Sequence, residues 1–132
     1  MSQDKLPNIY ATVSIDAIGE KTKSRWIGSF NVKRVLSHAD VMEFERMYSR
    51  LIPKGVDPSE ERRIQAATLA ELTVRIVSGP SWWDSTQGGQ LMVDMEPLYQ
   101  LMIECSKEEK AWSDEIDKLA SFGDGNIVKK SN

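Results

Sequence analysis

The chain has 132 residues, and its composition excludes several classes of protein before any motif is considered. Hydrophobic residues make up 40% and charged residues 28%, which is typical of a globular domain and not of a disordered chain. The formal net charge of -3 disfavours a general nucleic-acid binder, because such proteins present a positive surface to the phosphates. We expect a loose N-terminus over residues 1–8, one domain over residues 9–123 and a disordered tail over residues 124–132.

Cysteine usage and hydropathy indicate the compartment. With one cysteine, Cys105, an intramolecular disulfide is excluded, and a reducing compartment is indicated. The first residues lack the apolar core of a signal peptide, and no apolar run reaches transmembrane length. The expected location is therefore the cytoplasm.

Two alternating runs near the N-terminal end predict a β-hairpin. Apolar and polar residues alternate over residues 9–18, and a polar turn containing Gly19 follows. A second alternating run over residues 24–35 places Trp26 and Phe30 on one face. Because a lone hairpin is marginal in water, other elements must cover its apolar face.

Two helices are expected to follow the hairpin. The first begins at Ser37, which forms a capping-box pattern with Asp40, and ends near Ile52 because a proline follows. The second begins after Asp57, a favourable N-cap, and runs to about Val77, just before a Gly-Pro stop. The second half of this helix is apolar on most sides, which predicts a central position in the core or cover by a partner chain.

A third helix should begin after Asp94, which can cap it, and end near Gly123, a plausible C-cap. Its apolar stripe comprises Leu98, Leu101, Cys105, Trp112, Ile116 and Leu119. The predicted fold is therefore α+β, an antiparallel β-hairpin followed by three α-helices in the order ββααα.

Residues able to carry catalysis or bind metal are scarce. His38, the single histidine, lies at a helix start where a solvent-facing polar residue is common, and Cys105 lies on an apolar stripe. One histidine and one cysteine cannot form a zinc site, and no calcium or phosphate-binding loop is present in the sequence. We therefore predict no enzyme activity, no metal and no cofactor.

The residues that favour protein binding are aromatic, apolar or basic. Trp82 and Trp83 follow the Gly-Pro stop, where they are either a plug of the helical core or interface anchors. Basic residues cluster over residues 21–34, as a solvated face or as a docking surface for an acidic partner or another copy. The candidate partner-binding residues are Trp82, Trp83, Leu69, Leu72, Ile76, Trp112, Arg25, Lys33 and Arg34.

Three segments resemble small tailed-phage virion-morphogenesis proteins. Residues 26–37, which read Trp-Ile-Gly-Ser-Phe-Asn-Val-Lys-Arg-Val-Leu-Ser, resemble the early strand and capped helix of that family. Residues 69–83, an Ala/Leu-rich helix ending in Gly-Pro-Ser-Trp-Trp, resemble its central stretch, and residues 95–112 are similar to its closing acidic helix. The pattern is similar to phage tail assembly chaperones, although the predicted hairpin departs from a purely helical chaperone.

This resemblance implies a protein that binds phage tail or other virion proteins in the host cytoplasm and shields a tail component during assembly. One alternative is a structural or decoration protein that stays in the virion, where lattice contacts would involve the hairpin. Another is an inhibitor of a host enzyme. Each of these functions implies protein partners and allows a homo-oligomer, with no nucleic acid and no membrane.

Overall fold

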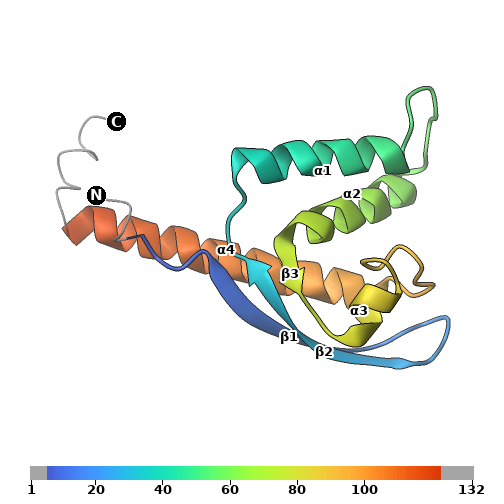
Figure 1. The fold of residues 1–132 in the computed structure, drawn as a ribbon, viewed down its shortest axis with the longest axis horizontal. Helices are drawn as coiled ribbons and strands as arrows, with labels where there is room; N and C mark the ends of the chain where they lie inside the picture. The colour runs from blue at the N-terminus through green and yellow to red at the C-terminus, as the bar shows by residue number, and fades with distance from the viewer. Residues whose placement is uncertain (1–5, 123–132) are drawn as a thin grey trace.

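The computed structural model describes residues 6–122 as an α+β fold with a three-stranded antiparallel sheet of order β1-β2-β3 (Figure 1). The elements are β1 (Tyr10–Ile18), β2 (Arg25–Lys33), α1 (His38–Leu51), α2 (Glu60–Arg75), β3 (Ile76–Ser78), α3 (Ser81–Ser85) and α4 (Glu96–Phe122). The α+β class is confirmed. The ββααα order is wrong, because β3 and α3 lie between the second predicted helix and the last. The predicted tail and the Gly123 cap fall outside the described residues, as does most of the predicted loose N-terminus.

The predicted hairpin is present and forms one wall of the core. β1 and β2 pair antiparallel, with Val13 opposite Phe30. Their alternation leaves one sheet face open to solvent, where the hydroxyls of Ser14 and Ser29 form a hydrogen bond of 2.9 Å. The other face contributes Val13, Ile15, Phe30 and Val32 to the core.

The start of α1 is also as predicted. Ser37 accepts a hydrogen bond from the backbone N–H of Asp40, and the Asp40 side chain accepts one from the backbone N–H of Ser37. This reciprocal capping box satisfies two backbone donors that the first turn of a helix leaves unpaired.

Helix α2 starts and ends at different residues from those predicted. Its N-cap is Ser59 and not Asp57, because the Ser59 hydroxyl accepts a hydrogen bond from the backbone N–H of Arg62. It ends at Arg75, because residues 76–78 leave the helix and pair with β2 as β3. The β-branched Ile76 and Val77 suit an extended backbone, and the edge of β2 supplies the partner that helical periodicity does not reveal.

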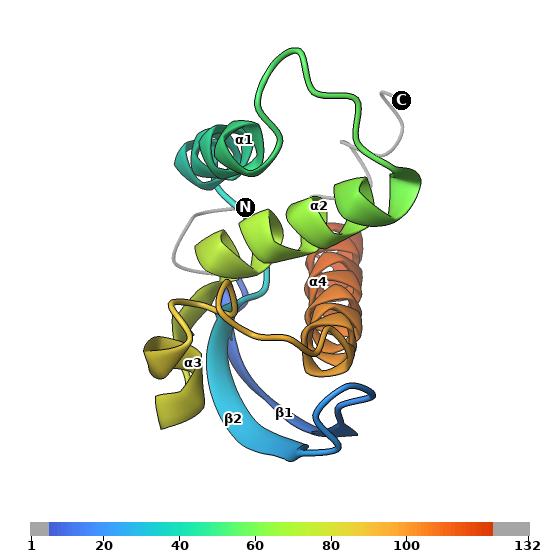
Figure 2. The same ribbon diagram turned by 90° about the vertical axis from the view of Figure 1, so that its right-hand side faces the viewer.

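Helix α2 lies between α1 on one side and the sheet with α4 on the other (Figures 1 and 2). Its wide apolar surface is therefore covered mainly by the chain itself, as the central position predicted for it requires. Helix α4 packs against β1 and extends past the end of the sheet (Figure 1). The first half of its predicted stripe is fully buried, at Leu98, Leu101 and Cys105, whereas Leu119 near its end is 37% exposed.

Candidate functional site

The paired tryptophans lie on α3 and close the core against β2. Trp83 is buried, with its ring centroid 5.8 Å from that of Phe30. Trp82 is half-buried, and its Nε1 donates a hydrogen bond of 2.9 Å to the Ile27 carbonyl, beyond the point where β3 ends. Of the two interpretations of this pair, the core plug describes Trp83, whereas Trp82 keeps part of its surface exposed.

Glycine at position 28 of β2 makes room for this segment. A Cβ added there would come within 2.5 Å of Pro80 Cγ, so only glycine allows the chain before α3 to approach the strand. A Cβ added at Gly79 would likewise come within 2.7 Å of Phe30 Cδ2, so the Gly-Pro-Ser-Trp-Trp stretch packs closely against β2 at both glycines.

The aliphatic candidates also belong to the core. Leu72 is fully buried, and Leu69 and Ile76 are partly buried against the same cluster. The structure does not support the prediction that Leu72 and Trp83 contact a partner, because the sheet and α4 cover both side chains in this conformation.

The three basic candidates are each paired within the chain. Arg25 contacts the Asp16 carboxylate at 2.6 Å on the exposed sheet face, and Lys33 contacts Asp40 at 2.6 Å. Arg34 is buried and pairs with carboxylates of α4. The cluster over residues 21–34 is therefore partly neutralised by the fold itself.

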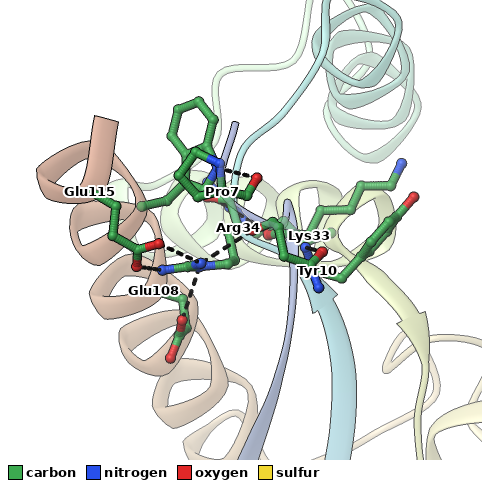
Figure 3. Close-up of polar contacts among 9 residues, drawn as sticks. Pro7, Tyr10, Lys33, Arg34, Glu108 and Glu115 are labelled. Atoms are coloured by element: carbon green, nitrogen blue, oxygen red, sulfur yellow. Dashed lines mark hydrogen bonds and ion pairs between the residues drawn. The ribbon is translucent and has the colours of Figure 1, made fainter. Parts of the chain in front are cut away.

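Arg34 joins the sheet to the middle and the second half of α4 (Figure 3). Its Nη2 lies 2.5 Å from Glu115 Oε2, and its Nε lies 3.2 Å from Glu108 Oε1. The hydrogen bond with Glu115 raises the pKa of Arg34. Close to this pair, Trp112 Nε1 donates to the Pro7 carbonyl at 3.4 Å, so Trp112 is half-buried by the N-terminal segment.

A second buried arginine, Arg75, has no counterpart among the predicted residues. Its Nε lies 2.8 Å from Glu71, its Nη2 pairs with Glu109 of α4, and its Nη1 donates to the Lys33 carbonyl at 3.0 Å. It therefore ties α2, β2 and α4 together at one point. The sequence alone shows an arginine near a helix end, a position that gives no signal of burial.

The single histidine and the single cysteine of the sequence lie in different environments. His38 is exposed in the first turn of α1, and Cys105 is buried in the core. Burial raises the pKa of the Cys105 thiol to about 11, so the thiol stays protonated near neutral pH. Within residues 6–122, no group of three or more His, Cys, Asp or Glu residues could hold a metal ion.

Asp94 binds the hairpin turn and not the helix that it was predicted to cap. It is buried, α4 begins only at Glu96, and the Asp94 carboxylate accepts hydrogen bonds from the backbone N–H groups of Lys21 at 2.9 Å and Thr22 at 3.2 Å. It also accepts from the Thr22 hydroxyl and from Trp26 Nε1. These bonds, that of Thr22 foremost, lower the pKa of Asp94 to about 2.

A groove of about 390 Å³ opens beside this turn, where the end of α1, the first half of α2, the loop before α4 and the first turn of α4 meet. Its apolar lining includes two partly buried methionines, Met92 and Met95, and Val93, which is 57% exposed. Its charged lining comprises Glu20, Lys21, Glu61, Arg62, Asp94 and Glu96. Carboxylates therefore outnumber cations in this groove, which we call the α2–α4 groove.

Tyr99 reports on the electrostatics of the α2–α4 groove that it lines. Burial raises the pKa of its phenol, and the nearby charges of Glu61 and Glu96 raise it further. Both carboxylates thus raise the pKa of the same phenol, although a hydrogen bond from Gln65 lowers this pKa and offsets part of the rise. The groove is suited to a cationic group placed next to an apolar one.

Sequence reasoning did not find this groove, because four segments distant in the chain build it. Of the partner-binding residues predicted from the sequence, only Leu69 lines the groove. The one usable signal in the sequence was the run Met92-Val93-Asp94-Met95, in which apolar residues flank a carboxylate outside any periodic element.

Comparison with known proteins gives no match. No family model, no curated protein and no solved structure matches this chain. The resemblance to phage morphogenesis proteins therefore stays a hypothesis. In the described part of the chain, no helix combines the length and the apolar character needed to cross a membrane.

Proposed function

We propose that this protein is a non-catalytic protein-binding module and that the α2–α4 groove receives a short segment of its partner. The observation that carries the proposal is the joint lining of flexible methionines, an exposed valine and surplus carboxylates. Methionine adapts to irregular apolar surfaces, and unpaired carboxylates favour partners that carry lysine or arginine. The volume lies within the range of about 300–1,000 Å³ that is usual for binding pockets.

Selection from a displayed peptide library tests this proposal. The wild-type chain should enrich peptides in which an aliphatic residue adjoins a basic one. Val93→Asp should lose roughly tenfold or more in affinity for these peptides, because it places a charge on the apolar lining. Val56→Asp is the matched control, since Val56 is 56% exposed in another loop and does not line the groove.

Failure to enrich any such peptide with the folded wild-type chain would refute the proposal. Equal loss of affinity in Val93→Asp and Val56→Asp would refute the assignment of binding to the α2–α4 groove. Circular dichroism of both variants shows whether either substitution acts through unfolding.

In its finer form, the proposal is that the partner is a phage tail component, shielded in the host cytoplasm during virion assembly. The support is the resemblance of residues 26–37 and 69–83 to virion-morphogenesis proteins. Mixing with a long coiled-coil tail protein should raise the mass seen by size-exclusion chromatography. Mass spectrometry of purified virions should find the chain absent, whereas an abundant subunit would contradict the chaperone role.

A further inference from the structure

The sequence after α4 carries a segment whose chemistry matches the α2–α4 groove. Residues 127–130 read Ile-Val-Lys-Lys, two β-branched apolar residues followed directly by two lysines. The groove offers an apolar lining at Met92, Val93 and Met95 beside a surplus of carboxylates. We propose that the α2–α4 groove receives residues 127–130 of a second copy of this chain. This inference rests on the proposed function, because it uses the same groove, and it gives that groove an occupant when no other partner is bound.

Distance requires that the donor be a second copy. The groove is lined by Tyr99 in the first turn of α4, and α4 continues to Phe122. At about 1.5 Å per residue, that stretch of helix is roughly 35 Å long. The five residues from Phe122 to Ile127 reach at most about 18 Å when fully extended. The segment therefore cannot return to the groove of its own chain.

Charge complementarity favours this occupant over an acidic or purely apolar one. Glu61 is exposed in the first turn of α2, and Glu96 occupies the first turn of α4 across the groove. Neither carboxylate forms an ion pair within the described residues, where Glu96 only accepts a hydrogen bond from the backbone N–H of Glu20 at 3.0 Å. Lys129 and Lys130 would supply the missing cations, while Ile127 and Val128 contact the methionines.

Such a contact is head-to-tail, because the groove is lined by the first turn of α4 whereas the donor segment follows the end of α4 in the sequence. A heterologous contact of this kind generates rings or open chains of copies and not a two-fold dimer. As the protein concentration rises, the chain should therefore form assemblies larger than a dimer.

The test uses a fluorescent synthetic peptide of residues 123–132 and the full chain carrying Ile127→Asp, whose own segment cannot compete. Fluorescence anisotropy should show saturable binding of the peptide. Adding Glu61→Lys should lower the affinity for the peptide roughly tenfold or more, since the new lysine repels the lysines of the peptide where a carboxylate attracted them. Glu60→Lys is the matched control, because Glu60 shares the first turn of α2 and does not line the groove.

Sedimentation velocity of the full chain supplies the second measurement. Wild type should form species larger than a dimer with rising concentration, and both Ile127→Asp and Glu61→Lys should remain monomeric. Association that survives both substitutions would overturn the inference. If the peptide of residues 123–132 does not bind the folded chain, the inference is also wrong. If the library still yields other basic, aliphatic peptides, the proposed function stands without it. If the folded chain binds no peptide of either kind, the inference and the proposed function are both wrong.

Discussion

Two phenylalanines mark the difference between the inner and outer regions of this molecule. Phe30 on β2 is 1% exposed, and its ring makes edge contacts with both Trp82 and Trp83. Phe44 on α1 is only half-buried and stacks on Tyr48, one turn along the same helix, at a centroid distance of 6.1 Å. Helix α1 contains no buried residue at all. An apolar pattern is present in both segments, alternating in β2 and helical in α1, but it leads to two very different degrees of burial.

The cause of the difference is the number of neighbours that each element has. β2 is covered by β1, β3, α3 and α4, whereas α1 packs mainly on α2 and faces solvent elsewhere (Figure 2). An amphipathic pattern shows that a helix has an apolar side. How deeply that side is buried depends on what covers it from the flanks. The stability of the fold should therefore come from the inner region, and each substitution below tests this division.

The largest effect is expected for Phe30→Ala. Removing this ring leaves a cavity beneath both tryptophans, which should lower the free energy of unfolding by about 3–5 kcal/mol. Urea denaturation followed by tryptophan fluorescence measures this loss. Ile27→Ala on the open face of the same strand, where Ile27 is 52% exposed, should change stability by about 0.5 kcal/mol or less. Similar losses for both variants would contradict a core confined to one sheet face.

Arg75→Met should have the next largest effect, and it tests how the inner region is joined. The substitution leaves Glu71 and Glu109 without their cation and leaves the Lys33 carbonyl without its donor. Because both carboxylates are partly exposed, we expect a loss of about 1–3 kcal/mol, below that of a fully buried pair. Arg63→Met is the control, since its pair with Asp57 is exposed and should contribute about 0–1 kcal/mol. Equal stability of the two variants in urea denaturation would show that Arg75 does not join the layers.

The parts of this fold that the sequence predicted are those that depend on nearby residues. Alternation in residues 9–18 and 24–35 predicted the hairpin, and Ser37 with Asp40 predicted the capping box. The parts that it missed depend on partners far along the chain. β3 exists because β2 offers a free edge, and Asp94 binds the hairpin turn 72 residues away.

The same reason explains the candidate site. Trp82 and Trp83 were singled out as large rings near a helix stop, but only the fold decides that α3 turns Trp83 into the core. Arg34 was expected at a charged surface, and its burial follows from the acidic residues that α4 places beside it. Composition shows which residues can bind a partner, whereas tertiary contacts decide which of them remain accessible.

Asp94→Asn should make the free energy of unfolding less dependent on pH. The folded state lowers the pKa of Asp94 from 3.8 to about 2, so the unfolded chain binds a proton at a higher pH than the folded chain. The stabilisation is therefore complete above about pH 4 and is lost as the pH falls through about 2. Denaturation at a series of pH values should show wild type more stable than the variant at pH 6, with the gap closing towards pH 2. A gap that stays constant across this range would mean that ionised Asp94 is not what holds the turn.

Phe44→Ala should have the smallest effect of the series, about 1 kcal/mol, because a half-exposed ring loses only part of its transfer free energy and leaves no closed cavity. Its effect should not change with protein concentration, and amide hydrogen exchange should remain faster in α1 than in α2 or α4. A loss close to that of Phe30→Ala would mean that α1 is covered in solution. If that loss grew with concentration, the cover would be another copy, because only an intermolecular contact makes the free energy of unfolding depend on the amount of protein present.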